Sequence, residues 1–170
     1  MKQVVGKTYY YSDFISEEER VVIEEWVLRN EMCFIPNPSG PFRLMQFFDN
    51  IPEKLDLVQE IKKRIIDIEN IEGEYFNPFM GDFASVHRNG GQVPQHIDHN
   101  PQDQTLYSRR YNVFITLPEK GGLPIYDGEV LDLPEKSLLR VDAGLIPHST
   151  TIIQGNKPRI ILSYGFAFKK

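Results

Sequence analysis

The spacing of hydrophobic and polar residues changes near residue 70. Before that point, two segments repeat apolar residues every three or four positions, which is the period of an amphipathic helix. We expect the first helix to follow Ser16 and end near Asn30, and the second to begin near Pro52 with Asn50 as its cap. The apolar stripes that predict their buried faces are Val22, Ile23, Trp26 and Val27, and Leu55, Val58, Ile61, Ile65 and Ile68.

Local signals refine the N-terminal half. Ser16 and Glu19 have the spacing of a capping box, in which the serine caps the helix and the glutamate returns a hydrogen bond. Residues 9–14 form an aromatic run that predicts a short strand. Residues 35–49 mix prolines and a glycine with aromatics, so we expect an irregular loop that lines a pocket.

Beyond residue 70, short β-type segments alternate with glycine and proline. The expected strands cover residues 83–88, 95–98, 111–117, 138–141 and 159–168. Helices followed by closely spaced strands predict a mainly β fold, a sandwich or barrel supported by helices. We expect one domain over residues 1–170, with residues 1–80 as a helical support region and residues 81–170 as the β core.

Composition and charge exclude several classes of protein. The 170 residues carry a net charge of −5 and no basic stripe, which argues against a nucleic-acid partner. Cys33 is the only cysteine, which excludes an internal disulfide and a multi-cysteine zinc site. No apolar run is long enough to span a membrane, and the first residues lack a secretory signal, so we expect a cytoplasmic protein with no membrane partner.

Two of the four histidines are candidates for chemistry because of their surroundings. His96 and Asp98 are separated by one residue, and prolines on both sides disfavour a helix. In an extended segment, residues two apart share a face, so these two side chains would point the same way and His99 the other way. A histidine and a carboxylate on one face can share a metal ion, and His148, much later in the chain, could be the third ligand.

Arg159 is a candidate for binding an anion. It stands at the start of the apolar run 160–162, which should lie in the wall of the β core. A charge in such a place normally has a partner, and a guanidinium can hold a carboxylate through two parallel hydrogen bonds.

With these residues in place, the chain resembles the iron(II)/2-oxoglutarate-dependent oxygenases, in particular their prolyl-4-hydroxylase-like branch. The resemblance covers most of the chain, from residues 10–19 to Arg159. Its motifs, in chain order, are His87, Gly90, His96-Ile97-Asp98, Gly121-Gly122, Pro134-Glu135-Lys136-Ser137, His148, Gly155 and Arg159. The resemblance implies a double-stranded β-helix, or jelly roll.

The resemblance also implies residue roles. His96, Asp98 and His148 would bind Fe(II), and Arg159 would pair with the distal carboxylate of 2-oxoglutarate. O₂ would be the second cosubstrate, with ascorbate as a further candidate cofactor. Thr116 shares a strand face with Asn112 and Phe114 and would point toward the cosubstrate, as would His87. Arg109, with Arg110 beside it, lies where a relative contacts substrate.

Three positions depart from the family pattern. His87 stands near the position of the usual tyrosine. Ile161 replaces the serine of an R-x-S pair, although Ser163 faces the same side. Gly165 stands where nucleic-acid demethylases of the superfamily carry a second arginine, which argues further against a nucleic-acid substrate.

Several alternatives remain open at this point. The first substrate choice is a prolyl residue of a peptide or protein, and a free amino acid or other small metabolite is the alternative. A cupin-like metal- or ligand-binding protein without turnover is the alternative from another class. The polar stretch 100–108 is either a lid beside the metal or an inert loop. The oligomeric state is left open.

Overall fold

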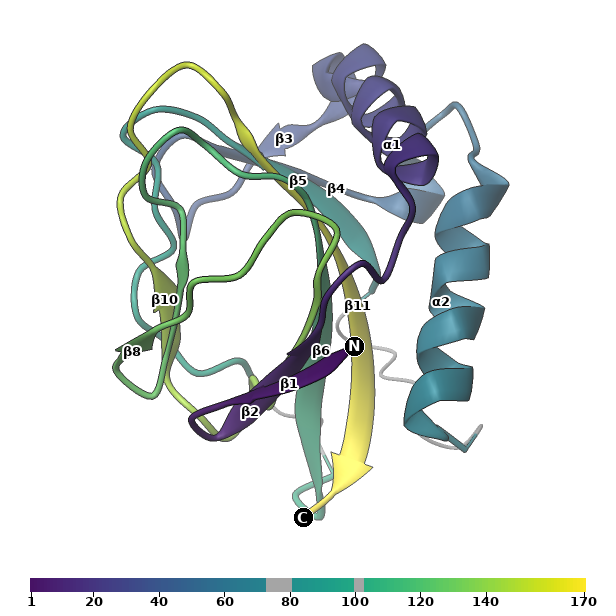
Figure 1. Ribbon diagram of the computed structural model, residues 1–170, viewed down its shortest axis with the longest axis vertical. Helices are drawn as coiled ribbons and strands as arrows, with labels where there is room; N and C mark the ends of the chain where they lie inside the picture. The colour runs from purple at the N-terminus through teal and green to yellow at the C-terminus, as the bar shows by residue number, and fades with distance from the viewer. Residues whose placement is uncertain (73–80, 100–102) are drawn as a thin grey trace.

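The computed structural model describes residues 1–72, 81–99 and 103–170. In these ranges the chain forms two α-helices, two 3-10 turns and eleven strands (Figure 1). The helical elements are α1 (Glu17–Arg29), η1 (Glu31–Cys33), η2 (Phe48–Asn50) and α2 (Asp56–Glu69). The strands are β1 (Lys2–Val5), β2 (Thr8–Tyr11), β3 (Ile35–Pro36), β4 (Arg43–Phe47), β5 (Phe83–His87), β6 (Leu106–Thr116), β7 (Pro124–Tyr126), β8 (Glu129–Val130), β9 (Leu138–Val141), β10 (His148–Thr150) and β11 (Arg159–Lys169).

The strands form two sheets that face each other as the walls of an open barrel (Figure 1). The larger sheet has the order β1-β2-β9-β6-β11-β5-β4-β3, and the smaller has the order β10-β7-β8. The two longest strands, β6 and β11, pair in the middle of the larger sheet. This architecture is a jelly roll, which confirms the predicted fold class.

Both helices cover the outer face of the larger sheet (Figure 1). Ile23, Trp26 and Val27 of α1, with Val58 and Ile61 of α2, belong to a core shared with the outer-facing residues of that sheet. The predicted stripes are slightly too wide, because Val22 and Ile68 are exposed. Among the described residues, no helix is both long and apolar enough to cross a membrane.

The predicted start of α1 is confirmed and that of α2 is wrong. Ser16 and Glu19 form both hydrogen bonds of the capping box. In contrast, Asn50 lies in η2, and α2 begins at Asp56 after Leu55. The indole of Trp26 donates a hydrogen bond of 2.8 Å to the carbonyl oxygen of Glu53, which holds this segment against α1 before the second helix begins.

Several strand boundaries also differ from the sequence prediction. The expected loop over residues 35–49 contains β3 and β4, because β4 pairs along its whole length with β5. Residues 95–98 form no strand and make only an isolated bridge between His96 and His148. Strand β6 begins at Leu106, so the last residues of the predicted loop 100–108 belong to the sheet, while residues 100–102 lie outside the described residues.

The space between the sheets has its own apolar core. Phe114, Leu139 and Ile161 of the larger sheet pack there with Tyr126 of the smaller one. The larger sheet is therefore covered on both faces, by helices outside and by the smaller sheet inside, and polar side chains on its inner face become part of an enclosed site.

Candidate active site

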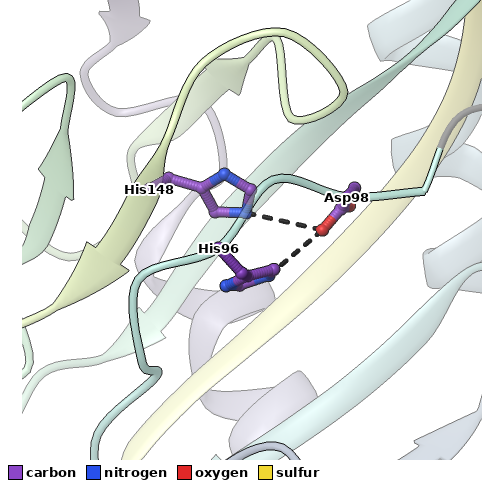
Figure 2. Close-up of side chains that lie close together, drawn as sticks. All are labelled: His96, Asp98 and His148. Atoms are coloured by element: carbon purple, nitrogen blue, oxygen red, sulfur yellow. Dashed lines mark ion pairs between the residues drawn. The ribbon is translucent and has the colours of Figure 1, made fainter.

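Three predicted ligands meet at one place between the sheets. His96 and Asp98 come from the segment between β5 and β6, and His148 begins β10 (Figure 2). One potential ligand atom from each residue lies within 4.8 Å of the others. The Nε2 atoms of His96 and His148 lie 3.1 Å and 3.5 Å from the same oxygen of Asp98, Oδ1.

The backbone fixes these side chains relative to one another. The amide of His96 donates to the carbonyl of His148 at 3.1 Å, and the amide of His148 donates to the carbonyl of His96 at 3.0 Å. Because residues paired across two strands share a face, both imidazoles point the same way. The amide of Asp98 donates to the carbonyl of Ala143 at 2.8 Å, which holds the carboxylate beside them.

Backbone carbonyls also set the orientation of both imidazole rings. Nδ1 of His96 lies 2.8 Å from the carbonyl oxygen of Pro94, and Nδ1 of His148 lies 3.1 Å from that of Ile146. A carbonyl can only accept a hydrogen bond, so each Nδ1 carries a proton. Both Nε2 atoms are then directed at the space beside Asp98, which is the orientation that metal ligands require.

Asp98 remains ionised although it is largely buried. Burial alone would raise the pKa of its carboxyl group, but hydrogen bonds from His148 and His96 and the charge of Arg110 outweigh burial and hold the pKa below its usual range. Arg110 approaches the second carboxylate oxygen, with Nε 3.7 Å from Oδ2. Oδ1 therefore faces the imidazoles and Oδ2 faces a guanidinium.

The distances in this cluster fit a shared divalent ion. Ligand atoms about 2.1 Å from one ion and at right angles to each other lie about 3 Å apart, which is close to the two separations between Nε2 and Oδ1. Two imidazoles and one carboxylate with open positions form the facial triad typical of non-haem Fe(II) oxygenases. The side chain of His96 is 41% exposed, so an ion can reach the cluster from solvent.

The cluster borders a cavity of about 430 Å³ between the two sheets. Its walls are mostly apolar, with Phe83, Phe114 and Ile161 from the larger sheet and Ile125 and Tyr126 from the smaller. A cavity of this kind excludes water from most of its surface and leaves a few polar groups to orient a ligand.

Arg159 lines the cavity, and its guanidinium has no ion pair with any described residue. Its side chain is buried, and no carboxylate of residues 1–72, 81–99 or 103–170 lies within ion-pair distance. Its Nε is buried without a hydrogen bond. Burial, together with the charge of Arg43, lowers the pKa of Arg159 to about 9. A guanidinium in this state is a site for an anion, because burying an unpaired charge costs free energy that a bound carboxylate would offset.

His87 lies between two arginines on the inner face of the larger sheet. It pairs with Arg43 of β4 on one side and with Arg159 of β11 on the other. Both ring nitrogens are buried without a hydrogen-bond partner among the described residues. Burial and the two positive charges lower the pKa of His87 to about 2, so the ring is neutral. The cavity lining does not include His87, and its expected contact with a cosubstrate remains a prediction.

Thr116 does not share the face that the sequence analysis expected. A β-bulge shifts the register of β6 against β11, so that Phe114 pairs with Ile161 but Thr116 pairs with Ile160. Ile160 belongs to the helix-side core, and the inserted residue therefore turns Thr116 away from the face of Asn112 and Phe114. The hydroxyl of Thr116 donates to the carbonyl of Pro158 at 2.7 Å.

The two adjacent arginines of β6, both candidates for substrate contact, lie in different surroundings. Arg109 lies outside the cavity, where its Nε is 2.6 Å from Oδ1 of Asp142 and its guanidinium carbon is 3.9 Å from the ring centre of Phe168. Arg110 lines the cavity instead. His99, which the sequence analysis expected to point the other way, lines the same cavity, and the described ligand cluster does not include it.

Sequence reasoning missed Arg43. This residue lies in the stretch predicted as an irregular loop. In the structure it belongs to β4, where it shares the cavity side of the strand with Met45 and Phe47. No local signal marks it, because residues 43–47 do not alternate apolar and polar residues and the strand is defined by its pairing with β5. Ser163 and Ile161 both line the cavity, which confirms that they share a side.

Comparisons with known proteins agree with this geometry. No protein-family model and no curated protein sequence matches the chain. Among solved structures, the viral collagen prolyl hydroxylase of Paramecium bursaria Chlorella virus-1, in complex with 2-oxoglutarate, is similar with a TM-score of 0.70 and 13% identity, over 95% of this chain and 96% of that chain.

HygX from Streptomyces hygroscopicus, solved with nickel and 2-oxoglutarate bound, is similar with a TM-score of 0.71 and 9% identity, over 94% of this chain and 82% of that chain. The chain has the jelly-roll fold of the 2-oxoglutarate oxygenases. A Pseudomonas putida prolyl-4-hydroxylase has the same oxygenase fold, with a TM-score of 0.63 and 14% identity over 95% of this chain and 91% of its own. Within this fold, the His–Asp–His cluster and Arg159 border the same cavity.

Proposed function

We propose that the protein is an Fe(II)- and 2-oxoglutarate-dependent oxygenase that hydroxylates a C–H bond. The observation that carries the proposal is one cavity holding both a His–Asp–His cluster and the buried guanidinium of Arg159, which has no ion pair within the described parts of the chain. A protein that only binds a metal ion has no use for such a cation. The combination therefore favours an enzyme with an anionic cosubstrate over a cupin-like binding protein.

In this proposal, Nε2 of His96, Oδ1 of Asp98 and Nε2 of His148 hold Fe(II). Three protein ligands leave three positions of an octahedral ion for a bidentate cosubstrate and O₂. Iron with 2-oxoglutarate and O₂ supplies the oxidative chemistry, in which one oxygen atom enters succinate and the other enters the substrate. The protein's own residues bind, orient and shield these components.

Each polar residue then has a defined task. The carbonyls behind His96 and His148 keep Nε2 unprotonated and directed at the ion. Arg110 holds the second oxygen of Asp98 and keeps that carboxylate from rotating. Arg159 binds the distal carboxylate of 2-oxoglutarate through a charge-assisted hydrogen bond, and the apolar walls of the cavity exclude water.

The candidate substrates follow from the resemblance and from the structural neighbours. A prolyl residue of a peptide or protein is the first candidate, since prolyl hydroxylases are among the similar structures, one of them in complex with a peptide of hypoxia inducible factor. A free amino acid or small metabolite is the second candidate, since HygX was also solved with hygromycin B bound. Residues 1–170 act as one domain in this proposal, because β4 from the first 80 residues lines the same cavity as β11.

The experiment is a succinate-release assay under air with Fe(II), 2-oxoglutarate and ascorbate, which the resemblance suggests as an accessory reductant. The expected result is succinate formation that requires Fe(II) and is lost in Asp98→Ala and His96→Ala. Proline-containing peptides and free amino acids are then screened for stimulation. Tight iron binding without any succinate, alone or with the panel, would favour the binding protein instead.

A further inference from the structure

The cavity carries more positive charge than is needed to balance the negative charges of the proposed cosubstrate. Its described lining contains three guanidinium groups, those of Arg43, Arg110 and Arg159, but only one carboxylate, that of Asp98. The chain as a whole has a net charge of −5, so this accumulation runs against its composition. Enclosed positive charge of this kind attracts anionic ligands and raises their local concentration.

The proposed function accounts for only part of this charge, and the inference that follows rests on that function. Fe(II) with the carboxylate of Asp98 leaves one positive charge, and Arg159 adds a second. Together they match the two negative charges of 2-oxoglutarate. Arg43 and Arg110 remain as cations in the cavity after the cosubstrate has been counted.

These two arginines differ in how far they are already engaged. Arg110 lies 3.7 Å from Oδ2 of Asp98 and donates a hydrogen bond of 3.0 Å to the carbonyl of Gly81. Arg43 has no ion pair with any residue in the described parts of the chain, and its Nε is buried without a hydrogen bond. Arg43 is therefore the cation that most needs an anion.

The surroundings of Arg43 indicate the body of the ligand. Its guanidinium carbon lies 5.8 Å from the centre of the Phe83 ring, and that of Arg110 lies 4.9 Å from the same ring. Met45 and Phe47, which follow Arg43 on the inner side of β4, complete an apolar wall. A ligand here would place a negative group on the guanidinium and an apolar body against the Phe83 ring.

We propose that the substrate is a small organic acid, whose carboxylate is bound by Arg43 with Arg110 beside it, and whose apolar body packs on Phe83. A free amino acid or another carboxylic acid fits this description directly. A prolyl peptide fits it when a carboxylate stands near the proline. Neutral substrates leave the guanidinium of Arg43 without an ion pair to any described residue and are disfavoured.

The test uses benzoate and benzamide, which have the same shape and differ in charge. Calorimetric titrations are made on the full chain holding Zn(II), which supports no oxygen chemistry, and N-oxalylglycine, an unreactive analogue of 2-oxoglutarate. We expect benzoate to bind about tenfold more tightly than benzamide. Arg43→Gln should reduce this preference to about threefold or less, while Arg88→Gln, which removes an exposed arginine paired with Glu31, should keep it.

The outcomes separate this inference from the proposed function. Equal affinities for benzoate and benzamide, undetectable benzoate binding, or an unchanged preference in Arg43→Gln would each overturn the substrate class. A larger loss of N-oxalylglycine affinity than of benzoate affinity in Arg43→Gln would assign Arg43 to the cosubstrate and overturn the inference as well. Failure of N-oxalylglycine to bind the Zn(II) protein, in contrast, would count against the proposed function itself.

Discussion

His96 and His148 exchange both of their backbone hydrogen bonds, although they lie far apart in the sequence. This pairing fixes two candidate metal ligands through the main chain, without help from an ion. We therefore expect the site to be organised before metal binds, so that the stability of the fold and the affinity for the metal can be measured separately.

The first prediction concerns metal removal. Chelation should leave a folded protein with cooperative thermal unfolding, because the bonds between His96 and His148 do not involve the ion. Adding Fe(II) or Zn(II) should then raise the melting temperature in proportion to the logarithm of the free metal concentration. Differential scanning calorimetry with and without metal makes the comparison. A chelated protein without a cooperative transition would show that the metal builds the site.

The second prediction concerns a ligand. His148→Ala should weaken binding of Zn(II) by at least about 100-fold, since even the loss of a supporting partner of a metal ligand costs about 10- to 100-fold. Metal titration followed by calorimetry measures this. His99→Ala is the matched control, because His99 lines the cavity but lies outside the cluster. Equal affinities in the two variants would remove His148 from the metal site.

The third prediction separates binding from stability at Arg159. Arg159→Met should weaken 2-oxoglutarate by about 1.5–3 kcal/mol, the range for hydrogen bonds to charged groups. The same change should leave the ligand-free protein as stable or more stable, because it removes a buried charge that has no ion pair with the described residues. Titration with 2-oxoglutarate and thermal unfolding measure the two effects. Lower stability with unchanged affinity would give Arg159 a structural role only.

The fourth prediction concerns acid stability and His87. Burial and the neighbouring arginines lower the pKa of His87 from 6.5 to about 2 in the folded protein. Between these values the unfolded chain binds the proton and the folded chain does not, so the free energy of unfolding falls as the pH drops below about 6.5. From pH 7 to pH 5, His87 should contribute a loss of about 2 kcal/mol.

Urea denaturation of the wild type and of His87→Gln at both pH values tests this contribution. Glutamine cannot titrate, so the variant should lose about 2 kcal/mol less than the wild type over the same pH interval. The three other histidines are present in both proteins and cancel in the comparison. Parallel losses in the two proteins would mean that His87 is protonated in the folded state.

The fifth prediction follows from the β-bulge. Thr116→Val removes the hydrogen bond to the carbonyl of Pro158 and should lower the free energy of unfolding by about 1 kcal/mol. Because Thr116 pairs with Ile160 and faces the helix-side core, the affinity for 2-oxoglutarate should change little. If Thr116→Val clearly lost affinity for 2-oxoglutarate while its stability was unchanged, Thr116 would contact the cosubstrate, as the sequence analysis suggested.

The sequence predicted the features that depend on local pattern. Ser16 and Glu19 start α1 as their spacing requires, and residues 138–141 form β9 as predicted. Strand β4 was missed because its stability comes from pairing with β5, which no local signal records. The sheet face on which Thr116 lies was predicted wrongly, because one inserted residue moves the following side chains to the opposite face. The residue types at that point do not indicate a bulge.

The candidate site divides in the same way. His96, Asp98, His148 and Arg159 could be proposed because their residue types and order carry the chemistry. Arg43 and the choice of Arg110 over Arg109 depend on strand register, which the sequence pattern did not resolve. The charge of the cavity, and with it the proposed substrate class, depends on β6, β11 and β4 lying in one sheet, with β5 between β11 and β4.

Anomalous diffraction from a crystal grown with Mn(II) and N-oxalylglycine tests the central claim most directly. The account predicts one metal peak within about 2.3 Å of Nε2 of His96, Oδ1 of Asp98 and Nε2 of His148. It also predicts that the far carboxylate of the analogue lies on the guanidinium of Arg159. A metal bound elsewhere, or an analogue that does not reach Arg159, would contradict it.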